Sequence, residues 1–329
     1  MQEERRSIAE LEVLEMSRRQ LCVIAVCTYK RPLLLRSLLQ KLNAQPFPNA
    51  EVDVHVLIVD NDIEQSARVV FDDCSSGFKN VTMHYLPAQP QGLVIARNAA
   101  LDYAKFLDAP VIFIDDDESP RSDWFQALWD MHMAFPRDVI AGPVVPQFEV
   151  EPPFWCESGA YWNRPTFEDA SVLQKPTGDG NILFPPALVQ NWRYSLRYNT
   201  SGAQDTHLLT RWIAAGQGLR WSARAVVTEI VPAGRMTFRY ALDRAYFSSL
   251  AYVWVDREFG SSAAWTLLRA GRRLTIGFAD YAVSLLRRDI WIRHRALLHF
   301  SSARGTFDGL RLTSFDRYTD YQIDASTKS

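Results

Sequence analysis

Four short apolar runs, each broken off by polar residues, constrain the fold of this chain most strongly. They cover residues 21–28, 52–59, 81–86 and 111–114. The run at 21–28 is nearly unbroken, which is typical of a strand buried on both faces, as in a parallel sheet, and the later runs are strand-like as well. Helix-compatible sequence follows the first three runs, at 33–42, up to Phe71, and at 93–107. The alternation predicts an α/β fold with a largely parallel sheet.

Composition places the chain among folded globular proteins. It has 329 residues, of which 47% are hydrophobic and 22% charged, enough for one large or two modest domains. Lys and Arg number 36 against 38 Asp and Glu, and this balance argues against a nucleic-acid partner. The four cysteines, Cys22, Cys27, Cys74 and Cys156, lack CxxC or zinc spacing, so we expect free thiols in a reducing compartment.

Neither a targeting segment nor a membrane span is visible in the sequence. Residues 1–20 are charged throughout, so we expect a short helix or tail there and not a signal peptide. The longest apolar runs fall short of the roughly 18 residues of a transmembrane helix. Further along, helices are expected at 186–196 and 207–215, strands within 219–231, and mostly helix over 237–300.

Polar residues follow the apolar runs where each predicted strand ends. Thr28, Asp60 and the acidic run Asp115 to Asp117 all take this position. The carboxyl ends of parallel strands share one edge of a sheet, where ligands bind in open α/β folds. These residues are therefore expected at one rim, although they lie far apart in the sequence.

The run Asp115-Asp116-Asp117-Glu118 is the sharpest chemical signal. Four adjacent acids repel one another unless a cation binds, and Mg²⁺ or Mn²⁺ takes carboxylate oxygens and bridges to phosphates. A solvated acidic turn or a helix N-terminus is the structural alternative. The position after a buried strand, with Asp60 on the same rim, favours the metal.

Three further residues each allow two interpretations. Asp60 at a strand end suits a base or ribose, or it caps the next helix. Arg97 suits a phosphate or a tie to the acidic rim, or it is an ordinary helix-surface arginine. Asp205 suits a general base that deprotonates a hydroxyl, or it is a helix cap, with His207 as a structural neighbour.

The C-terminal stretch from Trp265 to Phe300 is basic and amphipathic. Leu274, Phe278, Tyr281 and Leu285 fall on one helical face. Seven arginines accompany them, at positions 269, 272, 273, 287, 288, 293 and 295. The pattern suits an anionic membrane surface, and equally a helical appendage packed on the catalytic domain with its arginines in water.

Motifs in a fixed order resemble family 2 glycosyltransferases of the GT-A fold over roughly residues 20–245. They are Thr28-Tyr29-Lys30-Arg31-Pro32, Asp60-Asn61, Gly92-Leu93 with Ala96-Arg97-Asn98, Asp115-Asp116-Asp117, Gly178-Asp179-Gly180-Asn181 and Gln204-Asp205. Within that family, Val227-Thr228-Glu229, Val231-Pro232 and Arg235 look most like the succinoglycan-type exopolysaccharide glucosyltransferases.

The resemblance implies a GT-A (Rossmann-like) α/β fold, a UDP-sugar donor, a divalent metal (Mg²⁺ or Mn²⁺) and inversion at the anomeric carbon. UDP-glucose is the donor that the subfamily suggests. By similarity Asp117 is the metal ligand and Asp205 the catalytic base, and Gly178, Asp179 and Asn181 mark the acceptor region. The remaining similar positions would bind the nucleotide sugar: Thr28, Tyr29, Arg31, Asp60, Arg97, Asp115 and Asp116.

One departure from the family pattern concerns the base. Gln204 stands where the family has an acid beside the catalytic Asp, and the loss of a like charge is expected to lower the pKa of Asp205. The departure leaves open a non-catalytic nucleotide-sugar-binding module. A sugar nucleotidyltransferase fits less well, because no glycine-rich loop follows the first strand, and a metal-dependent phosphohydrolase is more distant.

The expected organisation has three parts. Residues 1–20 form a tail, 21–245 the GT-A domain, and 246–329 a helical extension suited to a membrane surface. Within the domain, 21–140 would bind the nucleotide and 141–245 the acceptor. The resemblance and the basic C-terminal stretch suit a cytoplasmic enzyme that is peripheral on the inner face of the cell membrane. Its acceptor would be a saccharide linked to a polyprenyl diphosphate.

Overall fold

The computed structural model describes residues 20–48, 51–155, 162 and 164–314. Residues 1–19 of the predicted helix or tail and Cys156 lie outside these ranges, whereas Gln20 already belongs to the first strand. Cys22, Cys27 and Cys74 are free thiols. The chain divides into two compact units. The first comprises residues 1–144, 166–193 and 212–227, and the second 145–165, 194–211 and 228–329.

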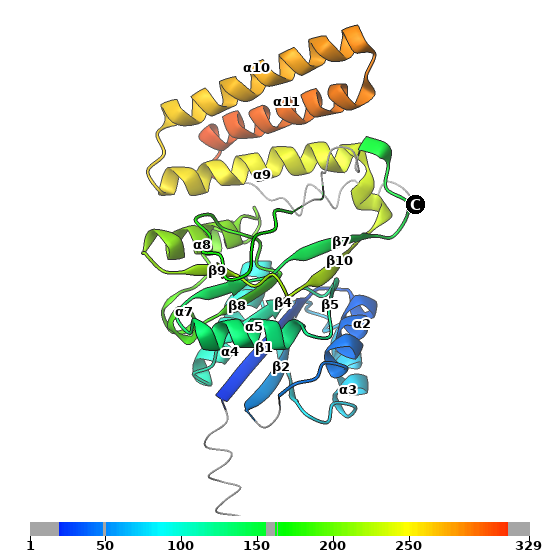
Figure 1. Ribbon diagram of the computed structural model, residues 1–329, viewed down its shortest axis with the longest axis vertical. Coiled ribbons are helices and arrows are strands. Elements are labelled where there is room, and N and C mark those ends of the chain that lie inside the picture. Colours follow the sequence, from blue (N-terminus) through cyan, green and yellow to red (C-terminus); the bar gives the residue numbers. More distant parts are fainter. Residues whose placement is uncertain (1–19, 49–50, 156–161, 163, 315–329) are drawn as a thin grey trace, which may run out of the picture. The chain divides into compact units, whose positions relative to one another are not determined.

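A seven-stranded sheet forms the centre of the first unit (Figure 1). Its strands, in spatial order, are β3 (Thr82–Pro87), β2 (Val52–Asp60), β1 (Gln20–Thr28), β4 (Val111–Ile114), β8 (Asn181–Phe184), β6 (Val139–Ala141) and β9 (Leu219–Trp221). β8 is antiparallel to both β4 and β6, and the other pairs are parallel. The expected mostly parallel α/β sheet is therefore confirmed.

Helices cover both faces of this sheet because its strands are apolar on both sides. The helices of the unit are α2 (Pro32–Asn43), α3 (Arg68–Ser75), α4 (Leu93–Phe106), α5 (Trp124–Ala134) and α7 (Pro186–Asn191). Ile24 and Val26 of β1 pack with Leu38 of α2 and Leu128 of α5 in one buried cluster. On the other face α4 packs against β1, β2 and β4, and α7 packs against α4.

Strand register brings the predicted rim residues to one edge. Thr28, the last residue of β1, lies opposite Asp60, the last of β2. β4 pairs with β1 through Ala25 and Phe113, so the acidic run that follows Ile114 leaves the sheet at the same edge. After the acidic run, β5 (Glu118–Pro120) continues the chain.

The second unit is mainly helical. α9 (Phe238–Glu258), α10 (Ala263–Arg287) and α11 (Ile290–Arg311) form a layer in which α11 packs between the other two (Figure 1). β7 (Val144–Phe148) and β10 (Val227–Val231) are strands of a small second sheet. Among the described helices, none combines the length and hydropathy that a bilayer span requires.

Two sequence-based boundaries were wrong. The helix expected over 186–196 ends at Asn191, because Trp192 adopts an extended conformation, and a separate 3₁₀ helix covers Leu196–Tyr198. α8 (Gln204–Ala214) begins earlier than expected. Asp205 therefore lies in the first turn of a helix and not in the preceding turn.

Candidate functional site

The acidic run after β4 is anchored to the end of β1 through its middle residue. Asp116 is buried, and its carboxylate accepts hydrogen bonds from Thr28 Oγ1 at 2.8 Å and Arg31 Nη1 at 2.9 Å. The same Arg31 nitrogen lies 3.3 Å from Asp117 Oδ2. Burial raises the pKa of Asp116, and Arg31 and Thr28 offset only part of this effect. The structure thus joins the first and fourth predicted motifs directly.

Arg97 ties the acidic run to a second loop. Its guanidinium is 2% exposed and pairs with Asp115 Oδ1 at 2.9 Å and Asp179 Oδ1 at 3.2 Å. Arg97 Nη1 also donates to the main-chain carbonyl of Asp179 at 2.9 Å, and the guanidinium lies 4.9 Å from the Phe113 ring centre. Of the interpretations offered by the sequence, this geometry corresponds to an arginine that ties down the acidic rim, and not to an ordinary helix-surface arginine.

The loop before β8 approaches the acidic run so closely that an added side chain would have to displace carboxylates of the run. A Cβ atom built on Gly180 would lie 2.7 Å from Glu118 Oε1 and 2.8 Å from Asp115 Oδ2. Nothing lies within 4 Å of the same atom built on Gly178. Asn181 is buried, and its amide joins Trp124, Pro143 and Ala225. Its side chain therefore ties the start of β8, where the loop ends, to α5 and to the main chain at Pro143 and Ala225.

Asp60 is fully buried at the end of β2, and its carboxylate accepts several hydrogen bonds at once. Its carboxylate accepts hydrogen bonds from Tyr85 Oη at 2.8 Å, the Ala67 amide at 2.9 Å and the Asp62 amide at 3.0 Å. Burial and the bond to Asp60 raise the pKa of Tyr85. Asp60 thereby fixes the segment between β2 and α3.

Asn61 holds the loop between β3 and α4 to the same rim. Its side-chain amide donates to the carbonyls of Ala88 at 2.6 Å and Pro90 at 3.2 Å, and its oxygen accepts from the Gly92 amide at 2.5 Å. The Asp60-Asn61 and Gly92-Leu93 motifs are thus in contact. Tyr29 is half-buried near this rim, with the Lys30 ammonium 5.5 Å from its ring centre.

Cys27 borders the ion pairs of Arg97, which sequence reasoning did not anticipate. Burial raises the pKa of its thiol to about 12, and Asp115, Asp179 and Asp116 add to the effect while Arg97 opposes it. The thiol is therefore protonated at neutral pH and unsuited to act as a nucleophile.

The rim carries more negative than positive charge. Its carboxylates belong to Asp115, Asp116, Asp117, Glu118 and Asp179, and its guanidinium groups to Arg31 and Arg97. Within the described ranges, no three His, Cys, Asp or Glu side chains gather as a self-sufficient metal site. Mg²⁺ is commonly held by one or two carboxylates together with substrate phosphates. Asp117 and the 43%-exposed Asp115 fit that mode, whereas Asp116 is occupied within the chain.

Asp205 lies in the second unit and is half-buried. One carboxylate oxygen accepts from the Thr206 amide at 2.6 Å and lies 3.3 Å from Thr206 Oγ1. Two residues on, buried His207 contacts Glu258 of α9 at 2.8 Å, and Tyr198 Oη donates to the same carboxylate at 3.2 Å. His207 thus has the structural role expected from the sequence, as it ties the start of α8 to α9.

Comparison with known proteins now identifies the class. Residues 23–184, which hold the rim described above, match the model of glycosyl transferase family 2. The chain is a family 2 glycosyltransferase with a GT-A-like fold. It is 27% identical over 292 residues to the succinoglycan biosynthesis protein ExoM of Rhizobium meliloti, and the alignment covers 87% of this chain and 92% of that protein.

A solved structure supports the fold. The mannosyltransferase PcManGT of Pyrobaculum calidifontis, solved in complex with GDP-Man and Mn²⁺, superposes with a TM-score of 0.55. The match covers 88% of each chain at 15% sequence identity. At this identity the likeness concerns the fold alone.

Several residues at the rim were not predicted as site residues. Glu118, Gly180 and Asn61 each stood inside a recognised motif, which was the available signal. Cys27 and Tyr85 lie within predicted strands, and no sequence signal marked them, because their role depends on which loops the fold brings to them.

Proposed function

We propose that the protein transfers a sugar from a UDP-sugar, UDP-glucose in the first instance, to a hydroxyl of a saccharide acceptor with inversion at the anomeric carbon. The excess of carboxylates at the carboxyl ends of β1 and β4 carries the proposal. Within a glycosyltransferase domain, such an excess suits a divalent cation bound together with a diphosphate.

The donor side of this proposal assigns roles to named groups. Asp117, with Asp115 beside it, would hold Mg²⁺ or Mn²⁺, and the ion would offset negative charge on the leaving diphosphate. Arg31 and Arg97 fix the carboxylates that face the donor. Thr28, Tyr29 and Asp60 line or support the nucleotide pocket, and Asp116 holds the acidic run in place.

The acceptor side rests on Asp205. Its carboxylate would remove the proton from the acceptor hydroxyl as the oxygen attacks the anomeric carbon opposite the diphosphate. Attack from that face inverts the configuration in one displacement. Gly178, Asp179 and Asn181 shape the loop assigned to the acceptor region. The half-exposed carboxylate of Asp205, in the first turn of α8, supports this role.

The product class is proposed from the relatives. Similarity to a succinoglycan biosynthesis protein over most of both chains supports a role in exopolysaccharide or cell-surface polysaccharide synthesis. The mannosyltransferase complex contains GDP-Man and Mn²⁺, which supports a nucleotide-sugar donor and a divalent ion in general terms. A saccharide on a polyprenyl diphosphate is the proposed acceptor, met by a cytoplasmic enzyme at the inner face of the membrane.

Calorimetric titration with UDP and UDP-glucose, with Mn²⁺ and then with chelator, tests the donor site. We expect binding that requires the metal and that Asp117→Ala abolishes. Asp53→Ala is the matched control, since Asp53 lies near the amino end of β2, away from the rim. Absence of nucleotide binding under every metal condition would overturn the proposal.

Transfer to a lipid-linked acceptor tests the catalytic role. Asp205→Asn is expected to retain UDP binding and to lose transfer by about a hundredfold or more. If both wild type and variant bind UDP-sugar and neither transfers the sugar to any acceptor, the protein is a non-catalytic binding module instead.

A further inference from the structure

Most of the large apolar side chains of α10 are exposed, whereas the residues that it buries are of another kind. Its buried residues are small or polar: Thr266, Ala270, Gly277, Asp280 and Ser284. They recur at intervals of four, seven, three and four residues along the side that meets α11. A soluble amphipathic helix normally buries its large apolar side. In α10 that relationship is reversed.

Close packing explains how this small-residue seam holds α10 in place. A Cβ atom on Gly277 would lie 2.7 Å from the Phe300 ring of α11, so only glycine allows this approach. Arg295 of α11 donates to both oxygens of Asp280 at 2.7 and 2.6 Å. Helix interfaces built on small residues and polar bonds leave the large side chains for another environment.

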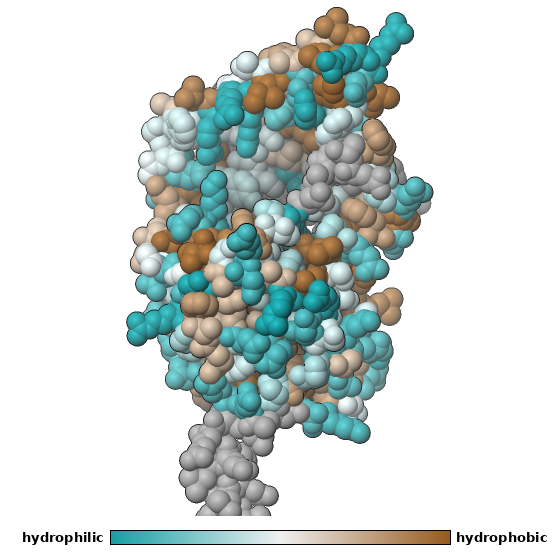
Figure 2. All heavy atoms as spheres, in the orientation of Figure 1, coloured by the Kyte–Doolittle hydropathy of each residue, from teal (hydrophilic) through white to brown (hydrophobic). Residues whose placement is uncertain are grey.

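We call the opposite side of α10, with the exposed apolar residues on it, the outer face. It comprises Leu267, Leu268, Phe278, Tyr281, Leu285 and Leu286. Phe278 is 65%, Leu285 55% and Leu286 86% exposed. In Figure 2, hydrophobic and hydrophilic residues alternate over the surface of this helix. Of the face predicted from Leu274, Phe278, Tyr281 and Leu285, all but Leu274 are exposed, although the Phe278 ring centre also lies 5.0 Å from that of Phe300 in α11.

Charge complements this apolar face. On its exposed side α10 carries Arg272 and Arg287, and Arg288 follows at its end, whereas Arg269 pairs with Asp256 of α9 and Arg273 donates to Ser249 of α9 and Thr306 of α11. Its single acidic residue, Asp280, is buried and paired with Arg295. The side turned to solvent is thus apolar and basic, the composition of helices that lie in the interface of an anionic bilayer.

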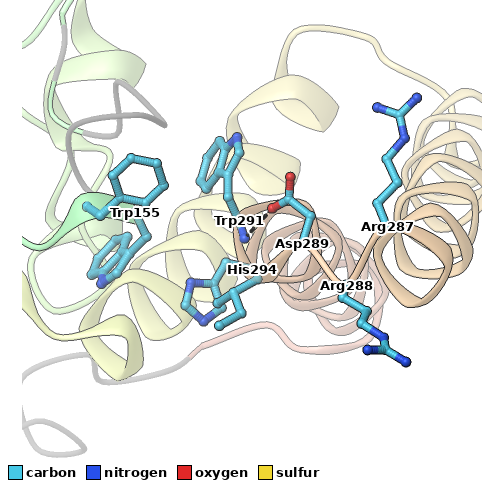
Figure 3. A pocket seen from close by; sticks show the side chains of 8 residues that line it. Trp155, Arg287, Arg288, Asp289, Trp291 and His294 are labelled. Carbon is cyan, nitrogen blue, oxygen red and sulfur yellow. Dashed lines mark hydrogen bonds between the residues drawn. The ribbon is translucent and has the colours of Figure 1, made fainter.

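The turn between α10 and α11 extends the basic character. A cavity of about 600 Å³ there is lined by Trp155, Trp291 and His294, with Arg287 and Arg288 at its margin. None of the residues assigned to donor or acceptor lines it. In Figure 3 the two guanidinium groups extend away from the aromatic side chains, and Asp289 accepts a hydrogen bond from the Trp291 amide at 2.8 Å. Arg287 and Arg288 are therefore exposed to anions in the solvent or on a surface.

The geometry points to an anionic lipid bilayer as the partner of the outer face, with α10 lying in the headgroup region. A second copy of the chain fits less well, because a two-fold interface would place the arginines of one copy against those of the other. This inference goes beyond the proposed transfer reaction. Its test needs neither donor nor acceptor, so its failure and that of the proposed function are separable.

Co-sedimentation of the full chain with vesicles tests this inference. We expect binding to phosphatidylcholine vesicles that contain phosphatidylglycerol, weaker binding to pure phosphatidylcholine, and weakening by salt. Phe278→Gln/Leu285→Gln should lower the partition coefficient about tenfold or more. The matched control, Phe106→Gln/Leu196→Gln, removes exposed apolar residues elsewhere and should bind as wild type does.

A second pair of variants tests the charge independently. Arg272→Gln/Arg287→Gln should weaken binding by about fivefold per arginine, whereas Arg68→Gln/Arg137→Gln should not. Circular dichroism verifies that each variant folds. If either the apolar or the arginine double variant fails to fold, vesicle binding by the other one tests the inference. Absence of wild-type binding to anionic vesicles would overturn the inference. So would unchanged binding by the folded outer-face variants, or a light-scattering dimer that these variants dissociate.

Discussion

Arg97 of α4 and Asp115 after β4 form an ion pair of 2.9 Å in which the arginine is buried and the aspartate is 43% exposed. The same guanidinium reaches Asp179 in the loop before β8. One cation thus determines where two acidic loops lie. The exposed oxygen of Asp115 remains available at the surface because Arg97 holds the residue from beneath.

Arg97→Met should therefore destabilise the first unit and weaken nucleotide binding. Removing one partner of a buried pair leaves the other carboxylates uncompensated, at a cost of about 3 kcal/mol in the free energy of unfolding. Urea unfolding measures the loss. Arg239→Met breaks an exposed i,i+4 pair with Asp243 and should change stability little. Equal effects of the two substitutions would contradict this assignment.

A matched glycine pair tests the close approach of the loop to the acidic run. Gly180→Ala places a Cβ atom against Glu118 and Asp115, and we expect a loss of about 1–3 kcal/mol in the free energy of unfolding. Gly178→Ala enters open space and should be nearly neutral. Thermal unfolding of both variants, with and without UDP, measures the difference in stability. A neutral Gly180→Ala would contradict the prediction, because it would show that the loop can move away from the acidic run without a loss of stability.

Asp116 should make stability depend on pH. Its folded-state pKa is raised above the ordinary 3.8, mainly by burial, so the unfolded chain loses this proton first as pH rises. The unfolded state then binds fewer protons, and Asp116 lowers stability progressively from about pH 4 up to its raised pKa, beyond which the loss is constant.

Asp116→Asn isolates this contribution. The difference in unfolding free energy between the variant and wild type should change in favour of the variant as pH rises from 4, and then level off. Urea titrations at a series of pH values measure it. A difference that is flat from pH 4 to 7 would show that the native carboxyl titrates normally.

The Cys27 thiol should react slowly with iodoacetamide. Because burial raises its pKa to about 12 from the ordinary 9.0, the alkylation rate in the folded protein should still increase with pH at pH 10. In denaturant the rate should be half-maximal near pH 9 and level off by about pH 10. Mass spectrometry of the peptide that contains Cys27 follows the reaction, and a plateau by about pH 10 in the folded protein would refute the shift.

The sequence predicted the sheet and the meeting of the rim residues because both follow from rules of local order. The run at 21–28 is apolar on both sides, as expected of a covered parallel strand. The rim followed from the common edge of parallel strands. β6, of three residues, is too short to give a pattern, and α5 buries residues on most of its sides, which weakens its periodicity.

Side-chain partners could not be predicted in the same way. Asp115, Asp116 and Asp117 are consecutive residues of the same type, and the sequence does not distinguish them. Of the three, only Asp116 is buried against Thr28. Whether Arg97 met a ligand or the acidic run depended on the position of Asp179, 82 residues away. Such pairings are decided by tertiary packing, which composition and spacing do not encode locally.

The small-residue seam of α10 and α11 also affects how the helical layer responds to heat. The residues that α10 buries are small or polar and carry little apolar area, so separating α10 from α11 exposes little new hydrocarbon surface to water. The heat-capacity increment of unfolding scales with that surface. The α10–α11 interface should therefore contribute less to this increment per residue than the sheet does, and its stability should vary less steeply with temperature.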